Sequence, residues 1–382
     1  MGYRDAIFGL ALAIATIAVG SSVRPVLAGG ARATNDGLPA PMAAASSPDA
    51  EPTLGHLARE RGLSIGTAVA VPVLERETVY QETLAREFNT VTAENVMKFE
   101  FLQPQRGGFD FTESDRLLAF AADRQMQVRG HTLVWHWALP DWLKEGNWTR
   151  EEAAAILKHH IEMVVGRYRG NIVAWDVVNE AIADDGTLRD SFWLRSIGPD
   201  YIEMAFRWAH AADPEALLFY NDYGGEGLGR KSDAIYALVK SLQAKAIPIH
   251  GVGLQMHVRV DSPPAAKDVA ANMQRLGELG LQVQITEMDV RIRQPATASH
   301  FERQATVYRE MLQTCLAADS CNAFVIWGFS DRYSWIPKHF QGWGDALIFD
   351  ARYQPKPAYK SLWEELATRS ERLQKFNPSA HP

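Results

Sequence analysis

Short apolar runs rich in Val and Ile alternate along the chain with longer stretches in which apolar residues recur at helical spacing. The helical stretches include residues 149–168, 231–246, 264–279 and 301–318. Thr149 is suited to cap the first of these, because a hydroxyl before an apolar helix accepts an unpaired backbone N–H. The predicted strands are residues 63–69, 87–95, 127–136, 171–180, 216–223, 250–257, 281–290 and 322–331.

Eight strands that alternate with helices predict parallel pairing, and eight strands suffice to close a barrel. We therefore expect an α/β fold, a (β/α)8 TIM barrel that forms a single catalytic domain. A doubly wound open sheet is the structural alternative. That fold would carry a Gly-rich phosphate-binding turn after the first strand, and the run GTAVAVP at 66–72 fits no such fingerprint.

Polar or aromatic side chains recur where the predicted strands finish. They are Asn95, His136, Glu180, Asp222, His257, Glu287 and Trp327, and we expect each to lie at the carboxyl end of its strand. In a TIM barrel the carboxyl ends of all strands meet at one rim, and that rim holds the active site. The sequence thus places its candidate chemistry on one rim.

The N-terminus has the pattern of an export signal. Residues 1–28 combine Arg4, an apolar run over 7–19 and the small-residue ending Val26-Leu27-Ala28, which predicts a cleaved signal peptide and a secreted or periplasmic protein. The apolar run is short for a membrane span, although an uncleaved N-terminal anchor is the alternative. After cleavage we expect no membrane contact.

Composition and periodicity predict where the linker, the domain and the C-terminal tail begin and end. Residues 29–52 are rich in Ala, Gly, Ser and Pro without periodicity and predict a disordered linker. A length of 382 residues allows two or three domains, but the uniform composition that follows predicts one catalytic domain over 53–370. Residues 371–382 are expected to form a C-terminal tail.

Charge and tryptophan content restrict the class of binding partner. A net charge of −7 argues against nucleic acid, because phosphate binding depends on an excess of Lys and Arg. Eleven tryptophans form an unusually large share of the chain, and indole rings can stack on sugar faces. Trp135, Trp327 and Trp335 lie at or just after strand ends, where such stacking would occur, whereas tryptophans on helical patterns are expected to pack in the core.

The two cysteines, Cys315 and Cys321, are six residues apart. In an oxidising compartment a disulfide could close this short loop. A zinc site is the alternative, but no further Cys or His stands nearby at ligand spacing.

Two glutamates form the strongest chemical pattern. Glu180 in WDVVNE and Glu287 in ITEMD follow the fourth and seventh strands, so they can face each other across the rim. Glycosidic cleavage uses such a pair: one carboxylic acid protonates the departing oxygen and one carboxylate attacks the anomeric carbon. Structural ion pairs with neighbouring Arg or Lys are the alternative. His257 can hydrogen-bond the nucleophile, and Asp289, on the same side of its strand as Glu287, can hold the other ring nitrogen.

Further polar residues surround this pair. Asn179 and Glu180 are adjacent and would alternate faces in a regular strand, so the strand must end or bulge there for both to serve the site. Glu94, Asn95 and Lys98 supply polar and charged groups on the loop after the second strand. A satisfied core group or a solvated loop is the alternative for each of these residues.

These motifs together resemble glycoside hydrolase family 10, the retaining endo-1,4-β-xylanases. The resemblance spans nearly the whole chain after the linker. Its landmarks occur in order: AENVMKFE (93–100), GHTLVWH (130–136), WDVVNE (175–180), NDY (221–223), GLQMH (253–257), TEMD (286–289), WGFSD (327–331) and SW (334–335).

The resemblance implies a role for each matching residue. Glu180 would be the general acid/base and Glu287 the nucleophile, with His257 and Asp289 tuning the nucleophile. Asn179 would bind the 2-hydroxyl of the sugar at the cleavage point. The remaining substrate contacts would be His131, Trp135, Tyr223 and Gln255, the set Glu94, Asn95 and Lys98 one sugar further toward the non-reducing end, and the platform Trp327 and Trp335. Cys315 and Cys321 match a disulfide found in many members.

Two positions depart from the family pattern. The usual x-Gln-x-Pro-x-Trp after Trp135-His136 is here Trp137-Ala138-Leu139-Pro140-Asp141-Trp142, so Ala138 has lost a substrate-binding amide. Gly224-Gly225 follows NDY, where Asn is common. Both departures concern affinity along the sugar chain and leave the chemistry intact.

The sequence therefore predicts a secreted, retaining endo-1,4-β-xylanase, expected to be monomeric, that binds xylan and xylo-oligosaccharides. We expect it to need no cofactor and no metal. A related barrel β-1,4-glucanase is the nearest alternative. A metal-dependent barrel hydrolase using His131, His136, His257 and Asp289, and a non-catalytic glycan-binding protein, are further alternatives.

Overall fold

The computed structural model describes residues 51–376, with side chains described as far as residue 368. The predicted signal peptide at 1–28 and all but the last two residues of the predicted linker lie outside the described residues. The predicted boundary at residue 370 falls within the last helix, and the division into domains stays a prediction.

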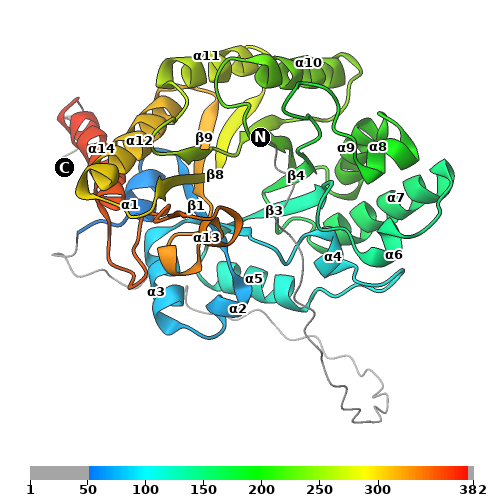
Figure 1. The fold of residues 1–382 in the computed structure, drawn as a ribbon, viewed down its shortest axis with the longest axis horizontal. Helices are drawn as coiled ribbons and strands as arrows, with labels where there is room; N and C mark the ends of the chain where they lie inside the picture. The colour runs from blue at the N-terminus through cyan, green and yellow to red at the C-terminus, as the bar shows by residue number, and fades with distance from the viewer. Residues whose placement is uncertain (1–50, 377–382) are drawn as a thin grey trace, which may run out of the picture. The chain divides into compact units, whose positions relative to one another are not determined.

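Eight parallel strands close into a barrel (Figure 1). Each strand pairs with the next along the chain, and β9 pairs with both β8 and β1, which leaves no free edge. This confirms the predicted (β/α)8 architecture. The barrel strands are β1 (Ser64–Val69), β2 (Thr90–Ala93), β3 (Gln127–Val134), β4 (Ala174–Asn179), β5 (Leu217–Asp222), β6 (Gly251–Leu254), β8 (Gln282–Arg293) and β9 (Cys321–Ile326).

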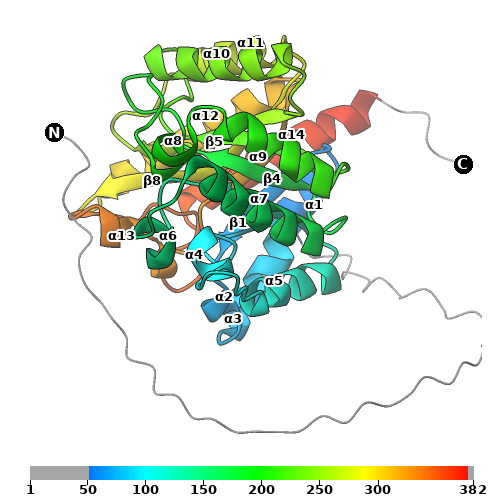
Figure 2. The ribbon, with the colours of Figure 1, turned by 90° about the vertical axis from the view of Figure 1, so that its right-hand side faces the viewer.

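Helices surround the strands, as Figure 1 shows along the barrel and Figure 2 from the side. The long helices that connect successive barrel strands are α3 (Thr78–Glu87), α5 (Thr112–Asp123), α7 (Arg150–Arg167), α9 (Tyr201–Ala212), α10 (Arg230–Ala244), α11 (Ala266–Gly277) and α12 (Ala298–Ala317), and α14 (Pro357–Phe376) follows the last strand. The shorter ones are α1 (Leu54–Arg59), α2 (Val71–Leu74), α4 (Phe99–Leu102), α6 (Asp141–Lys144), α8 (Phe192–Ile197) and α13 (Ile336–His339), with a 3₁₀ turn at Asp331–Tyr333.

Helix α7 illustrates how the sequence pattern sets a helix. Thr149 caps it, and its hydroxyl accepts the N–H of Glu152 while the Glu152 carboxylate accepts the N–H of Thr149. This is the capping that the sequence predicted. Leu157, Ile161 and Val164 recur at helical spacing and are fully buried against the barrel. Each such side chain stabilises the fold by about 1.5–3 kcal/mol relative to exposure.

Strand β8 is longer than expected and continues past the barrel to Arg293. Beyond the barrel it pairs with β7 (His257–Arg259) on one side and with β10 (Trp343–Gly344) on the other. The expectation that Glu287 and His257 end their strands is therefore wrong: Glu287 lies inside β8, and His257 begins β7. Pairing with these two segments supplies the backbone hydrogen bonds that prolong β8. Figure 2 shows α6 and α13 on the side toward which β8 extends.

Cys315 and Cys321 form a disulfide that joins α12 to the start of β9, as the sequence predicted. None of the helices within residues 51–376 is both long and apolar enough to span a lipid bilayer.

Candidate active site

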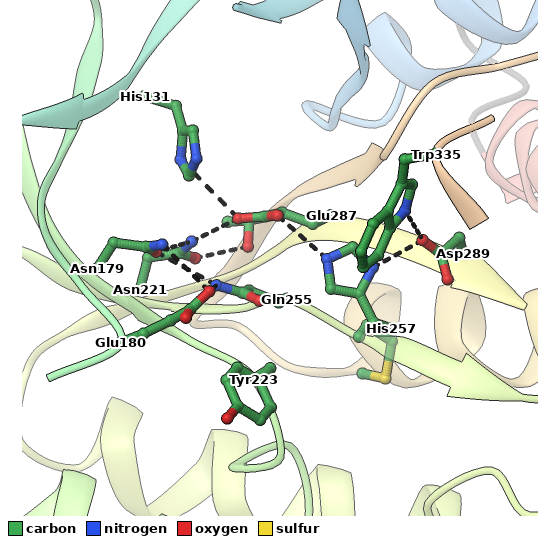
Figure 3. Close-up of polar contacts among 12 residues, drawn as sticks. His131, Asn179, Glu180, Asn221, Tyr223, Gln255, His257, Glu287, Asp289 and Trp335 are labelled. Carbon is green, nitrogen blue, oxygen red and sulfur yellow. Dashed lines mark hydrogen bonds and ion pairs between the residues drawn. The ribbon is translucent and has the colours of Figure 1, made fainter. Parts of the chain in front are cut away.

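Glu287 lies on the inner side of β8, and the residue is only 4% exposed. Its Oε1 accepts the amide N–H of Asn221 at 2.7 Å and lies 3.9 Å from His131 Nδ1, while His257 Nε2 is 3.2 Å from Oε2 (Figure 3). Burial alone would raise the pKa of Glu287, but His131 and His257 outweigh it and hold the pKa below the ordinary range. Glu287 is thus an ionised carboxylate at neutral pH, the state a nucleophile requires.

His257 is held between two carboxylates. Its Nδ1 lies 2.7 Å from Asp289 Oδ2, which also accepts the indole N–H of Trp335 at 2.8 Å. Burial opposes a positive charge on the ring, but Asp289 and then Glu287 overcome this and raise the pKa of His257 to about 10. The ring is therefore a cation that donates one hydrogen bond to each carboxylate, which fixes the direction in which Glu287 points.

Glu180 has a more open and less charged environment. Its Oε1 accepts the amides of Gln255 at 3.0 Å and Asn179 at 3.3 Å, and its Oε2 is 3.9 Å from His136. Burial lowers the pKa of His136 to about 3, so that ring is neutral. No cation is bonded to the Glu180 carboxylate within the described residues, in contrast to Glu287. Two carboxylates in such different surroundings can divide the acid and nucleophile roles.

Amide side chains connect the two glutamates. Asn221 Nδ2 donates to both Glu287 Oε1 and Asn179 Oδ1 (2.8 Å), and Asn221 Oδ1 accepts the Thr286 hydroxyl at 2.7 Å. Gly253 on the neighbouring strand makes room for this amide, because a Cβ there would stand 2.1 Å from Asn221 Oδ1. The relative positions of the carboxylates are therefore set by a fully bonded network.

The backbone turns sharply at three rim positions. Glu180, Ala138 and Met256 have φ values of 56°, 53° and 66°, which are uncommon for residues other than glycine. Strand β4 ends at Asn179, so the turn at Glu180 brings two adjacent side chains to the same site. The irregularity that the sequence predicted at this pair is present, and it costs energy that the surrounding hydrogen bonds must offset.

A buried ion pair between Arg129 and Asp176 lies inside the barrel beneath the glutamates. Arg129 Nε donates to Asp176 Oδ2 at 3.0 Å, and Arg129 Nη1 reaches Gln284 Oε1 at 2.6 Å. These residues come from β3, β4 and β8, so the contacts cross the barrel interior. His131 Nδ1 lies 3.0 Å from Asp176 Oδ2 and is thereby anchored below Glu287.

The loop after β2 provides the predicted polar set. Lys98 Nζ donates to Asn95 Oδ1 at 2.8 Å and lies 5.0 Å from the ring centre of Trp135. Burial raises the pKa of Glu94 and lowers that of Lys98, and each charge partly offsets the shift of the other. These groups can hydrogen-bond hydroxyls, and the charge of Lys98 interacts with both Glu287 and Glu180.

Aromatic rings border the site on two sides. Trp335 stands 4.9 Å from the His257 ring, and Trp327, which is largely buried, stands 5.1 Å from the His131 ring. Tyr223 lies beside Glu180 on the side away from Glu287, as Figure 3 shows. Its hydroxyl accepts a hydrogen bond from Arg189 at 3.1 Å, and Lys231 Nζ lies 3.5 Å from its ring centre.

The structure brings most of the predicted residues into one network. Glu94, Asn95, Lys98 and Trp135 lie together nearby. Sequence reasoning missed four groups that hold this network, namely Arg129, Asp176, Asn221 and Thr286. The signal for Asn221 was present: it stands in NDY, two residues before Tyr223, on the strand next to Asn179.

His131, His136, His257 and Asp289 do not gather into one cluster, although His257 and Asp289 are in contact. His131 pairs with Asp176, and His257 pairs with Asp289 and Glu287. Within residues 51–376, no group of three or more His, Cys, Asp or Glu side chains is arranged to hold a metal ion.

Comparison with known proteins agrees with this geometry. The model of glycosyl hydrolase family 10 matches residues 53–365. Endo-1,4-beta-xylanase B of Thermotoga neapolitana is 42% identical over 314 residues, which cover 81% of this chain and 90% of that protein. Endo-1,4-beta-xylanase A of Fusarium oxysporum f. sp. lycopersici is 41% identical over 290 residues, covering 74% and 89%.

Solved structures resemble the whole barrel. Native xylanase 10B from Thermotoga maritima superposes with a TM-score of 0.82 at 42% identity and covers 84% of this chain and 99% of its own. Xylanase 10B from Thermotoga petrophila, solved in complex with xylobiose, gives a TM-score of 0.82 at 41% identity and covers 84% and 98%. The chain forms a closed eight-stranded barrel with two glutamates at its rim, and the family model matches nearly all of the described residues. The chain therefore belongs to glycosyl hydrolase family 10.

Proposed function

We propose that this protein is an endo-1,4-β-xylanase that hydrolyses internal β-1,4-xylosidic bonds of xylan with retention of configuration. The observation that carries the proposal is the pair Glu180 and Glu287, two carboxylates joined by one amide network but held in different electrostatic surroundings. Relatives at about 40% identity are named endo-1,4-beta-xylanases, and two neighbouring structures contain xylobiose.

In the first step, Glu287 attacks the anomeric carbon of the sugar at the cleavage point. A bond forms between a Glu287 oxygen and that carbon while the bond to the bridging oxygen breaks. Glu180 gives its proton to the departing oxygen, which leaves as the hydroxyl of the released sugar chain. Because Glu287 is buried, ionised and aimed by His257 and Asn221, little reorientation is needed before attack.

In the second step, water replaces the departed sugar. Glu180, now a carboxylate, takes a proton from the water, whose oxygen attacks the anomeric carbon as the ester bond to Glu287 breaks. Two inversions at the same carbon restore the starting configuration. Glu180 ends protonated and Glu287 ionised, ready for another cycle.

The sugar contacts follow the geometry of the rim. Asn179 and Gln255 stand beside Glu180 and can hydrogen-bond hydroxyls of the sugar under attack. Lys98 and Asn95, near Trp135, serve the next sugar toward the non-reducing end, and Trp335 flanks the same side. Tyr223, on the opposite side of Glu180, serves the departing sugar. Glu94, His131 and Trp327 complete the proposed binding set.

A β-1,4-glucanase of the same barrel type is the alternative, and no observation favours it. We expect Glu94, Asn95, Lys98 and Trp335 to leave little room for the hydroxymethyl group that glucose carries and xylose lacks. The direct test is release of reducing sugar from xylan and from carboxymethyl-cellulose by the purified protein. We expect rapid release from xylan and little from the cellulose derivative. Equal or greater release from the cellulose derivative would overturn the xylan assignment.

We further propose that the protein is exported and acts as a monomer. The charged start, apolar run and small-residue ending of residues 1–28 support export, as does a disulfide between the only two cysteines. N-terminal sequencing of the mature protein tests cleavage after residue 28, and light scattering tests the monomer. A first residue within 1–28, or a mass of twice the chain, would contradict these proposals.

A further inference from the structure

Trp137 is an exposed tryptophan at the rim that the site described above does not use. Its exposed fraction is 42%, and the exposed large apolar side chains among the described residues are few. Phe101 and Trp137 are the two aromatic ones, the others being Val79, Met163, Val173 and Leu228. The backbone N–H of Glu100 donates to the Ala138 carbonyl at 2.9 Å, so both aromatic residues lie on rim segments that this bond connects.

A row of side chains leads from the nucleophile to Trp137. His131 Nδ1 lies 3.9 Å from Glu287 Oε1, and the His131 ring centre is 6.5 Å from that of Trp135. The Trp135 ring is in turn 5.9 Å from the Trp137 ring, with 37° between their planes. Lys98, proposed to serve the second sugar on the non-reducing side, stands over Trp135. Trp137 is therefore the exposed ring at the end of this row, and it also packs against the His136 ring at 5.7 Å.

The backbone around Trp137 is firmly held. The Trp135 carbonyl accepts the indole N–H of buried Trp193 at 3.0 Å, and the Ala138 carbonyl is bonded to Glu100. Between these anchors Ala138 adopts a φ of 53°, a conformation that costs energy for a residue with a side chain. A ring presented by a fixed loop loses little conformational freedom when a ligand covers it, which favours binding.

The neighbouring residue shows what kind of contact this position can make. Ala138 stands where the family pattern has Gln, and its methyl group cannot hydrogen-bond a hydroxyl. The side chain at position 138 therefore offers only apolar contact, and the C–H faces of a xylopyranose ring fit the neighbouring exposed indole.

We infer that Trp137 forms an additional sugar-binding position, which stacks on the third xylose unit on the non-reducing side of the cleaved bond. The inference rests on the proposed xylanase function and deepens it. Its consequence is a preference for chains that reach at least three sugars beyond the cleavage point on that side. Contact over about 60 Å² of apolar surface, at about 25 cal/mol per Å², predicts a gain of about tenfold in kcat/KM, which is 1.4 kcal/mol.

The experiment compares a long substrate, xylohexaose, with a short one, p-nitrophenyl β-xylobioside, which ends before Trp137. In Trp137→Ala we expect the ratio of kcat/KM for the long to the short substrate to fall about tenfold. Trp137→Phe, which keeps an aromatic face, is expected to lose less than threefold. Met163→Ala is the matched control, because Met163 has the same exposed fraction on helix α7 and we expect an unchanged ratio.

An unchanged ratio in Trp137→Ala, or equal losses on both substrates, would overturn the inference, since equal losses would mean that the ring only supports its loop. A ratio that falls as far in Met163→Ala would overturn it as well. If the unaltered protein hydrolysed neither substrate, the proposed function would fail and the inference with it. Activity of the unaltered protein on both substrates separates these two cases.

Discussion

Replacing Asp289 with Asn removes the charge that most strongly keeps His257 protonated. In the structure, Asp289 Oδ2 lies 2.7 Å from His257 Nδ1, and the raised pKa of about 10 arises from Asp289 first and Glu287 second. The substitution keeps the shape of the side chain and an acceptor oxygen. The charge is lost, and the carboxylate oxygen without a hydrogen-bond partner becomes an NH2 group, so the change in the pKa of His257 reports chiefly the electrostatic contribution of Asp289.

The size of the effect follows from the strength of that bond. A hydrogen bond between charged partners contributes about 1.5–3 kcal/mol, and one pKa unit corresponds to about 1.4 kcal/mol. We therefore expect Asp289→Asn to lower the pKa of His257 by about one to two units from its value of about 10. The free energy of unfolding at pH 6 should fall by about the same 1.5–3 kcal/mol.

The pH dependence of stability has a defined sign. Since the pKa of His257 is raised by folding, its contribution is complete below the ordinary value of 6.5 and is lost as the pH rises toward about 10. In Asp289→Asn this loss of stability should be complete at a pH one to two units lower than in the wild type. The assay is an NMR titration of the His257 ring, assigned by its absence in His257→Gln, together with urea unfolding from pH 6 to 11.

Two results would refute this reasoning. The first is a wild-type His257 that titrates near 6.5, which would mean that the two carboxylates do not hold it charged. The second is an Asp289→Asn protein whose His257 still titrates within a few tenths of a unit of the wild type. In the control His257→Gln/Asp289→Asn, stability should no longer fall between pH 6.5 and 10 on account of this residue, because the ring that titrates is gone.

Three further substitutions test other parts of the site. Glu180→Ala should retain the first step on aryl xylosides with good leaving groups but stall at the second step. Added azide should restore turnover and give a β-xylosyl azide as product. Equal loss of both steps would contradict the acid/base role. Asn221→Ala should lower kcat by about 10–100-fold, because a small misplacement of the nucleophile slows the reaction by that amount. A kcat within twofold of wild type in steady-state assays would argue against positioning by this amide. Lys231→Met leaves the buried Asp222 carboxylate without its 2.9 Å ion-pair partner and should destabilise the protein by about 3–5 kcal/mol at pH 8. Burial raises the pKa of Asp222 to about 7, so the loss in urea unfolding should be smaller at pH 5, and an equal loss at both pH values would contradict this account.

The sequence predicted the architecture well because barrel folding repeats one local pattern. Alternating apolar runs and amphipathic stretches identified all eight barrel strands, and Thr149 identified the start of α7. The glutamates were found for a similar reason: Glu180 directly follows β4 and Glu287 lies within β8, and the order of these strands along the chain matches their order around the barrel. The adjacent pair Asn179 and Glu180 even indicated where the backbone had to turn.

Contacts between distant segments were harder to predict. The extension of β8 to Arg293 depends on β7 and β10, and β10 begins at Trp343, 50 residues later in the chain. The ion pair of Arg129 with Asp176 is buried inside the barrel, where a local pattern would place apolar side chains. The exposure of Trp137 likewise depends on how its loop is anchored, by Trp193 and by the backbone of Glu100. Each of these features is set by tertiary packing, which periodicity does not report.

In the proposed mechanism, Glu287 forms a covalent bond to the sugar. The most direct measurement is mass spectrometry after incubation with a 2-deoxy-2-fluoro-β-xylobioside that carries an activated leaving group. The fluorine slows both steps and the leaving group accelerates the first, so the intermediate accumulates. We predict a mass increase of one fluoro-xylobiosyl group, located by peptide mapping on Glu287. An adduct on another carboxylate, or the absence of any adduct together with inverted products from xylan, would contradict the account.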